Sequence, residues 1–139
     1  MYDELREGEL RQPVDQPEFR AEQPMNRQPS IMGSGYGMTP ASVDYDIQST
    51  CPEVFDELEL KKLRLGDVVA LKDQLNFWGR GYYEGAMSIG IIVHGWSYKA
   101  GHGPGVITFL SAKPGRIATK KDAGANIAYY LGIREKPKV

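Results

Sequence analysis

Three short apolar runs, separated by turns rich in glycine and proline, constrain the fold of this chain more than any other feature. The runs lie at residues 68–71, 86–94 and 106–110, have the length of strands and are rich in β-branched residues. Neighbouring residues within each run are apolar on both faces, which predicts strands that are covered on both sides. Other sheet, a helix or another subunit would supply that cover.

Two short helices complete the predicted fold. Thr50 and Glu53 fit a capping box that predicts a helix running to about Leu60, with Pro52 in its first turn. Thr119 offers the N-cap of a second helix that packs on the sheet. The sequence therefore predicts an α+β domain with a small, mainly antiparallel sheet or partial β-barrel, two short helices and an extended N-terminal arm.

The length of 139 residues suits one domain with a single modest core. Residues 1–30 carry several prolines among polar and charged residues, and too few large apolar side chains to bury against each other. They are predicted as an extended or disordered arm, which either lies on a partner subunit or stays disordered. Residues 31–133 form the predicted globular domain, and residues 134–139 form a tail.

Charge and composition exclude several classes of protein. Seventeen basic residues against eighteen acidic ones give a net charge of −1, so no positive field would gather the phosphates of a nucleic acid. No apolar run approaches the roughly 20 residues that a membrane-spanning helix needs. The first eleven residues lack the apolar stretch of a secretory signal, so a cytoplasmic location is expected. The lone Cys51 cannot form an internal disulfide.

A histidine surrounded by glycines is the most unusual local feature. The segment 100–105 loses much conformational entropy on folding without adding core side chains, which suggests a function. Its backbone amides can face an oxyanion while His102 acts as acid, base or ligand; alternatively, it is a tight hairpin that leaves His102 exposed. A second glycine loop, at 33–37, is either a turn or a ligand cradle. The residues predicted to bind a ligand in the two loops are Gly33, Ser34, Gly35, Gly101, Gly103 and Gly105.

Arg80 lies between two glycines and beside four aromatic residues, at positions 77, 78, 82 and 83. A guanidinium in such surroundings can recognise a carboxylate or a phosphate, and the rings can stack on a planar ligand. Arg80 is therefore predicted as an anion clamp. The alternative is a long hairpin whose aromatic side chains pack beneath it or at a subunit interface.

Two aspartates and two histidines are the candidate metal ligands. Asp44 and Asp46 point to the same side if the chain is extended there, and such a pair can bind magnesium or a similar hard cation. His94 ends an apolar run and, with His102 and one aspartate, can complete a site of two histidines and one carboxylate. The alternatives are solvation or capping roles for the aspartates and a structural role for His94.

Two side chains are weaker candidates for a nucleophile. Cys51 is predicted at the start of a helix, where N–H groups stabilise a thiolate, but the nearby Glu53 and Asp46 oppose its ionisation. Ser34 lies between glycines, yet the flanks of a nucleophile elbow are not met.

Six motifs resemble those of one family in their order and spacing. They are Met32-Gly33-Ser34-Gly35, Asp44-Tyr45-Asp46-Ile47, Leu65-Gly66-Asp67, Gly85-Ala86-Met87-Ser88-Ile89-Gly90, Val93-His94 and Ala100-Gly101-His102-Gly103-Pro104-Gly105-Val106. The chain thus resembles the C-terminal half of the family called domain of unknown function 4438. The resemblance implies relatives with a β-rich N-terminal half, which here is either supplied by a separate subunit or not needed. It implies no activity, and it places Cys51 where relatives need not carry cysteine.

These features together predict three glycine loops, at 33–37, 79–85 and 101–105, that converge on a polar pocket. The chain is then an enzyme or enzyme subunit that acts on a small anionic metabolite, with a divalent metal as the candidate cofactor. The alternative is a non-catalytic assembly or ligand-binding subunit, in a homo-oligomer or in a hetero-oligomer whose other subunit carries the missing N-terminal half. The residues predicted to carry the chemistry are Arg80 as anion holder, His102 as proton-transfer group, and Asp44 and Asp46 as auxiliary acids or metal ligands.

Overall fold

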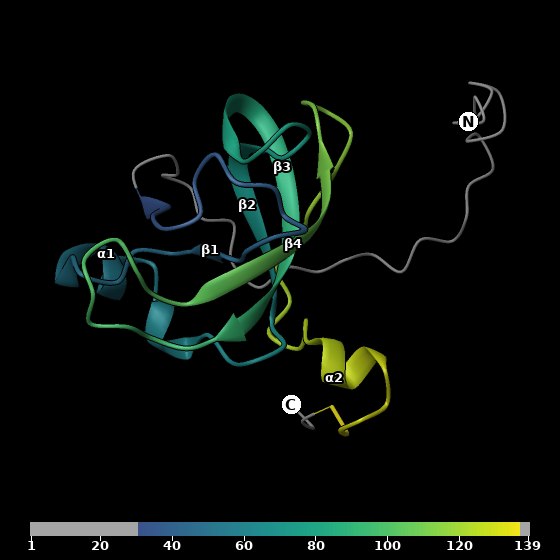
Figure 1. Ribbon diagram of the computed structural model, residues 1–139. Coiled ribbons are helices and arrows are strands. Elements are labelled where there is room, and N and C mark those ends of the chain that lie inside the picture. The colour runs from purple at the N-terminus through teal and green to yellow at the C-terminus, as the bar shows by residue number, and fades with distance from the viewer. Residues whose placement is uncertain (1–30, 137–139) are drawn as a thin grey trace, which may run out of the picture.

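An antiparallel sheet of four strands forms the centre of the protein (Figure 1). The computed structural model describes residues 31–136, so the predicted arm at 1–30 and the end of the predicted tail lie outside the described residues. The strand order across the sheet is β1-β4-β3-β2. With two short helices beside this sheet, the predicted α+β fold is confirmed. The strand bounds are Tyr45–Asp46 for β1, Val68–Leu75 for β2, Gly81–His94 for β3 and Gly105–Ala112 for β4.

The three apolar runs form strands as predicted, and each strand extends beyond its run. β2 continues past Lys72 and Asp73, where its apolar run ends. Asp73 has a left-handed backbone, with a φ of 57°, at an irregularity between Lys72 and Gln74. Its Oδ1 accepts a hydrogen bond of 2.7 Å from the amide of Gly85 on β3. Pairing resumes at Gln74 and Tyr82, after a stretch in which four residues of β3 lie opposite the single residue Asp73 of β2, so the bulge belongs to β3.

Helix α1 spans Pro52–Glu57 and is shorter than predicted. The predicted capping box at Thr50 is wrong, because Cys51 is the N-cap and makes no side-chain capping hydrogen bond with any described residue. The proline lies in the first turn, as predicted. Glu59 then adopts a left-handed backbone with a φ of 52°, so the chain continues as a 3₁₀ turn, η3, at Leu60–Lys62.

Helix α2 spans Ile127–Tyr130, so the predicted start at Thr119 is wrong. The N-cap is Asn126, whose Oδ1 accepts a hydrogen bond of 2.9 Å from the amide of Ala128. Through Nδ2 the same side chain donates to Asp67 Oδ1 at 2.8 Å, which ties α2 to the start of β2. Within the described part of the chain, no helix has the length and apolar character needed to cross a membrane.

Apolar side chains pack on both faces of the sheet. Successive residues of a strand point to opposite faces, so Val69 and Leu71 belong to one cluster while Val68 and Ala70 belong to another. The first cluster is covered by side chains from α1, η3 and the segment before β1. The second face is covered only in part, since Ile107 on β4 remains 44% exposed.

Candidate functional site

The register of three strands places two aspartates beside a histidine. β1 pairs with the start of β4, with Asp46 opposite Gly105, and β4 pairs with the end of β3, with Gly105 opposite His94. Asp46, Gly105 and His94 therefore form a row across neighbouring strands. Asp44 projects to the same side as Asp46, because side chains alternate along an extended chain, whereas Tyr45 between them is buried in the core.

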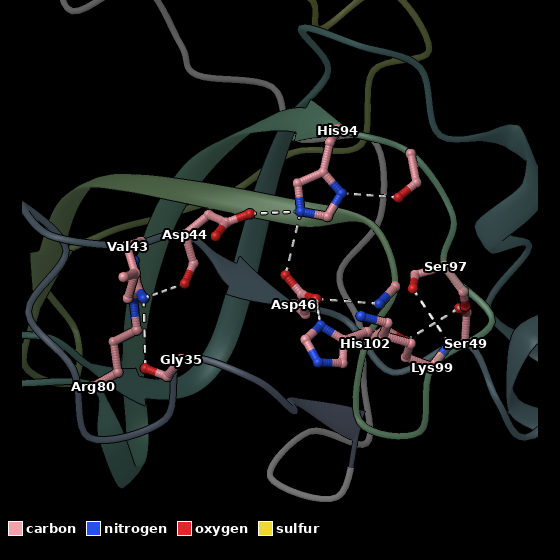
Figure 2. A network of polar contacts seen from close by, with 12 residues as sticks. Gly35, Val43, Asp44, Asp46, Ser49, Arg80, His94, Ser97, Lys99 and His102 are labelled. Carbon is pink, nitrogen blue, oxygen red and sulfur yellow. Dashed lines mark hydrogen bonds and ion pairs between the residues drawn. The ribbon is translucent and has the colours of Figure 1, made fainter.

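All four predicted metal candidates come together in what we call the carboxylate–histidine cluster: Asp44, Asp46, His94 and His102 (Figure 2). His94 Nε2 lies 2.6 Å from Asp44 Oδ2 and 3.4 Å from Asp46 Oδ1. His102 Nδ1 lies 2.8 Å from the other oxygen of Asp46, Oδ2. Ligand atoms from Asp44, Asp46 and His94 all lie within 4.8 Å of one another, which is close enough for them to share one metal ion.

Both ring nitrogens of His94 face acceptors. Nδ1 lies 3.0 Å from the carbonyl oxygen of Gly95, which can only accept, so Nδ1 carries a proton. Nε2 faces the two carboxylates, so a proton shared with a carboxylate or a cation must lie between them. The hydrogen bond to Gly95, followed by the charges of Asp44 and Asp46, raises the pKa of His94. A metal ion bound here would take the place of the Nε2 proton.

His102 is oriented by Asp46 through Nδ1, which leaves Nε2 as the nitrogen that can exchange a proton with a ligand. The buried Ser49 holds the loop that carries His102. Its amide and its hydroxyl both donate to the carbonyl oxygen of His102, at 3.2 and 3.3 Å. This contribution of Ser49 is not predicted from the sequence, because nothing in a serine before a helix signals a contact with a residue 53 positions away.

Gly105 is required at the centre of the row by steric constraint. A Cβ atom at this position would collide with Asp44 Oδ2 and with His94 Nε2. The two side chains can therefore approach each other only above a residue without a side chain. This steric role differs from the predicted role of Gly105 in binding a ligand.

Gly105→Ala is expected to separate Asp44 from His94 and to lower the free energy of unfolding by about 1 kcal/mol, because the new Cβ atom displaces the ends of two partly exposed side chains. Gly95→Ala is the matched control, because a Cβ atom at Gly95 would meet nothing within 4 Å. Urea unfolding of both variants measures the difference. Equal stability of the two variants would show that the close approach at Gly105 is not needed.

Two glycine loops flank β1 and pack through backbone hydrogen bonds. Gly33 N donates to the carbonyl oxygen of Asp46 and Ser34 N donates to that of Gly101, each at 2.8 Å. Gly103 N approaches Asp46 Oδ2 at 3.4 Å. These amides bind oxygens of the protein itself, so in this structure the loops shape the cluster and do not present a row of donors to a ligand.

The position of Arg80 differs from the position that an anion clamp would need. Its side chain is buried, and its guanidinium donates to the backbone carbonyls of Asp44, at 2.6 Å, of Val43 and of Gly35. The guanidinium carbon also lies 5.1 Å from the ring centroid of Tyr45. Figure 2 shows the guanidinium on the side of Asp44 that faces away from the histidines. The prediction is therefore corrected: Arg80 fixes the backbone of the aspartate segment and does not face the cluster.

The two nucleophile candidates make no contact with the cluster through their reactive atoms. Cys51 is exposed, and its Sγ lies 3.3 Å from Glu53 Oε2. The side chain of Ser34 is exposed as well. Among the residues that the structure describes, neither side chain contacts a histidine, so neither has the neighbouring base that commonly activates such a nucleophile.

The family resemblance of the motifs extends along most of the chain. Residues 6–131 match the model of the DUF4438 C-terminal domain, a domain of unknown function. A solved structure, described as the crystal structure of TM1086, is 42% identical and covers 73% of this chain with a TM-score of 0.65. The match covers 35% of the TM1086 chain, so this chain spans about a third of that relative's length. No curated protein matches the sequence.

Proposed function

The chain belongs to the DUF4438 family, whose C-terminal domain it matches, and we propose that the carboxylate–histidine cluster of this chain is a divalent-metal centre. The centre would serve an enzyme or enzyme subunit that acts on a small anionic metabolite. The observation that carries this proposal is the convergence of Asp44, Asp46 and His94, whose ligand atoms lie within 4.8 Å of one another.

The donor set suits a divalent ion such as Zn²⁺, Mn²⁺ or Fe²⁺, which bind carboxylate oxygen and imidazole nitrogen. With a neutral imidazole, the two carboxylates carry two negative charges, which a divalent ion would balance. The other ring nitrogen of His94, Nδ1, donates a hydrogen bond to the carbonyl oxygen of Gly95, an arrangement typical of metal-bound histidines. His102 holds the second oxygen of Asp46 and would orient that ligand from outside the first coordination sphere.

The anionic class of substrate rests on the proposed ion and not on charges of the protein itself. Arg80 binds backbone carbonyls, so it offers no positive charge to a substrate at the cluster. Asp44 and Asp46 alone would repel an anion. Three protein ligands leave coordination positions to which an anionic oxygen can bind, and a divalent ion there would polarise that oxygen.

Proton transfer in this proposal belongs to His102. Asp46 accepts a hydrogen bond from Nδ1–H of His102, which favours the neutral tautomer whose Nε2 carries a lone pair. The His102 side chain is 40% exposed, so a substrate can reach it from solvent. His102 would act as the general base or acid, while Asp46 keeps its ring oriented.

Titration calorimetry of the full chain tests the proposal. We expect one ion per chain for at least one of Zn²⁺, Mn²⁺ and Fe²⁺. Oxalate or inorganic phosphate should then bind to the metal-loaded chain and not to the metal-free chain. Absence of binding for all three ions would refute the metal centre, whereas metal binding without anion binding would refute the substrate class alone.

Metal affinity is expected to rise with pH, because His94 must lose its Nε2 proton to bind the ion. The pKa of His94 is raised above the ordinary value of 6.5, so below that raised pKa affinity should fall about tenfold per pH unit. The stability of the metal-free chain should show the opposite trend. The ion pair of protonated His94 with Asp44 stabilises the fold at low pH, and this stabilisation is lost as pH rises through the folded-state pKa of His94. Calorimetry and thermal unfolding between about pH 5.5 and 8 measure both trends. His94→Asn should abolish both, and a wild-type affinity independent of pH would exclude His94 as a ligand.

The length of the relative favours a second candidate function. The match covers about a third of TM1086, and in this candidate a separate subunit would supply regions of that relative that lie outside the match. In that case the chain is an assembly or ligand-binding subunit of a hetero-oligomer. Mass spectrometry of proteins that co-purify with the full chain from its native source should find such a subunit. A chain that purifies alone and binds both metal and anion would argue against it.

A further inference from the structure

The face of the sheet that carries the carboxylate–histidine cluster also carries exposed apolar side chains beside it. Gly105 identifies this face, because a Cβ atom at Gly105 would meet Asp44 Oδ2 and His94 Nε2. Residues two apart on a strand point to the same side, so the side chain of Ile107 lies on the cluster's side of β4. Val106, between them, is buried in the core on the other face. Ile107 follows Gly105 by about 7 Å along the strand.

The pairing of β3 with β4 places two more apolar side chains beside Ile107. Directly paired residues of antiparallel strands point to the same side, and the register pairs Ile107 with Ile91. Leu110 is paired with Ile89, which is buried in the second apolar cluster, so Leu110 lies on this face as well. Ile107 and Leu110 are 44% and 43% exposed, and Ile91 is half-buried. We call Ile91, Ile107 and Leu110 the apolar strip.

Packing within the described part of the chain covers one half of this face and leaves the other half open. The β2 half belongs to the second apolar cluster, which Ala125 and Ile117 from the segment after β4 complete. A single exposed isoleucine would be ordinary on a protein surface. Three apolar side chains in register beside the carboxylates and imidazoles differ from that, because apolar side chains next to a few convergent polar groups are the usual composition of a small-molecule site.

We propose that the apolar strip binds the apolar part of the substrate whose anionic end the metal centre holds. This inference rests on the proposed function and narrows the substrate class to an anion that carries an uncharged hydrocarbon chain. An anionic end held between Asp44 and His94 lies beside Gly105, and Ile107 is the next residue on the same side of β4. A longer chain would reach Leu110. The strip offers no charged partner, so a second charge at the far end of the substrate would gain nothing there.

Three carboxylates test the strip on the metal-loaded full chain by titration calorimetry. Acetate provides the anionic group alone, hexanoate adds an alkyl chain, and adipate ends a chain of the same length with a second charge. Burial of one methylene group raises affinity up to about fourfold, so hexanoate on this open strip should bind at least about tenfold more tightly than acetate. Adipate should gain little over acetate.

Two substitutions of exposed isoleucines locate the preference. Ile107→Thr removes the apolar side chain nearest the cluster and keeps a β-branched residue in the strand. The advantage of hexanoate over acetate should then fall to about threefold or less. Ile133→Thr is the matched control, because Ile133 is also exposed and lies after α2, outside the strip. It should keep the wild-type preference. Metal titration of both variants shows separately whether the metal centre is intact.

The outcomes distinguish a failure of the strip from a failure of the metal centre. Equal binding of acetate and hexanoate, or of hexanoate and adipate, would refute the strip and leave the metal centre standing. A chain that binds no metal ion or no anion would refute both. The strip would also be refuted if Ile107→Thr kept the hexanoate preference, or if it dissociated a wild-type dimer, since a second copy would then cover this face. If Ile107→Thr does not fold, the wild-type series decides alone.

Discussion

Replacing Asp46 with asparagine is expected to abolish stable metal binding, with a loss of affinity of at least about a hundredfold. Asp46 is central to the cluster, since one oxygen faces His94 and the other accepts from His102. The substitution therefore removes a ligand charge and also the partner that orients His102, and loss of an outer partner alone typically costs 10–100-fold. Titration calorimetry with the ion that the wild type binds measures the effect.

Asp56→Asn is the control for this substitution. Asp56 is exposed and pairs with Lys61 on the surface, so the variant removes the same charge without touching the cluster. Its metal affinity should equal that of the wild type. If the folded Asp46→Asn variant bound metal as tightly as the control, the ion would have to lie elsewhere.

The second large effect is expected for stability, from Arg80→Met. Methionine retains much of the side-chain volume but leaves the carbonyls of Asp44, Val43 and Gly35 without their guanidinium partner. A buried polar group left unsatisfied costs about 1–3 kcal/mol, so the free energy of unfolding should fall by about 3 kcal/mol or more. Urea unfolding measures this loss.

Two further variants separate this role of Arg80 from that of an anion clamp. Arg116→Met, at an exposed position, should leave stability within about 0.5 kcal/mol of the wild type. Arg80→Lys should recover only part of the loss, because one ammonium cannot reproduce the planar fork that meets three carbonyls. If the Arg80→Met variant kept wild-type stability and lost only anion binding, the result would support the anion-clamp role of Arg80 and contradict its structural role.

The approach of Asp44, Asp46 and His94 could be predicted in part from local signals, although the predicted set of ligands was two histidines and one carboxylate. Asp44 and Asp46 alternate along an extended segment, and His94 ends an apolar run. Residues at the ends of neighbouring strands meet when the strands pair, and here the register aligns Asp46, Gly105 and His94. What the sequence did not contain was this register, which depends on bulges in β3 and β4.

The sequence predicts the wrong role for Arg80, because the neighbours of Arg80 in sequence differ from its neighbours in the fold. In sequence it has glycines and aromatic residues as neighbours, which is typical of an exposed ligand site. In the fold the loop before β1 covers it, and the carbonyls of that loop take its donors. The same contact leaves the aromatic side chains on the outside. This agrees with the interpretation of the segment as a hairpin, whose contact with a subunit stays a prediction.

The predicted helix boundaries are wrong for a similar reason. Thr50 and Thr119 fit local capping patterns, but the caps are Cys51 and Asn126. Asn126 is selected by its tertiary partner Asp67, a contact between residues 59 positions apart. Local capping chemistry cannot report such a contact, so it mislocates a short helix whose position is set by the packing around it.

Anomalous diffraction from crystals of the full chain grown with Zn²⁺ or Mn²⁺ tests the metal centre most directly. The account predicts one strong anomalous peak about 2.0–2.3 Å from His94 Nε2 and from carboxylate oxygens of Asp44 and Asp46, with His102 still bonded to Asp46. A peak bound by other residues, or a cluster in which His94 and Asp44 remain paired at high metal concentration without a peak, would contradict it.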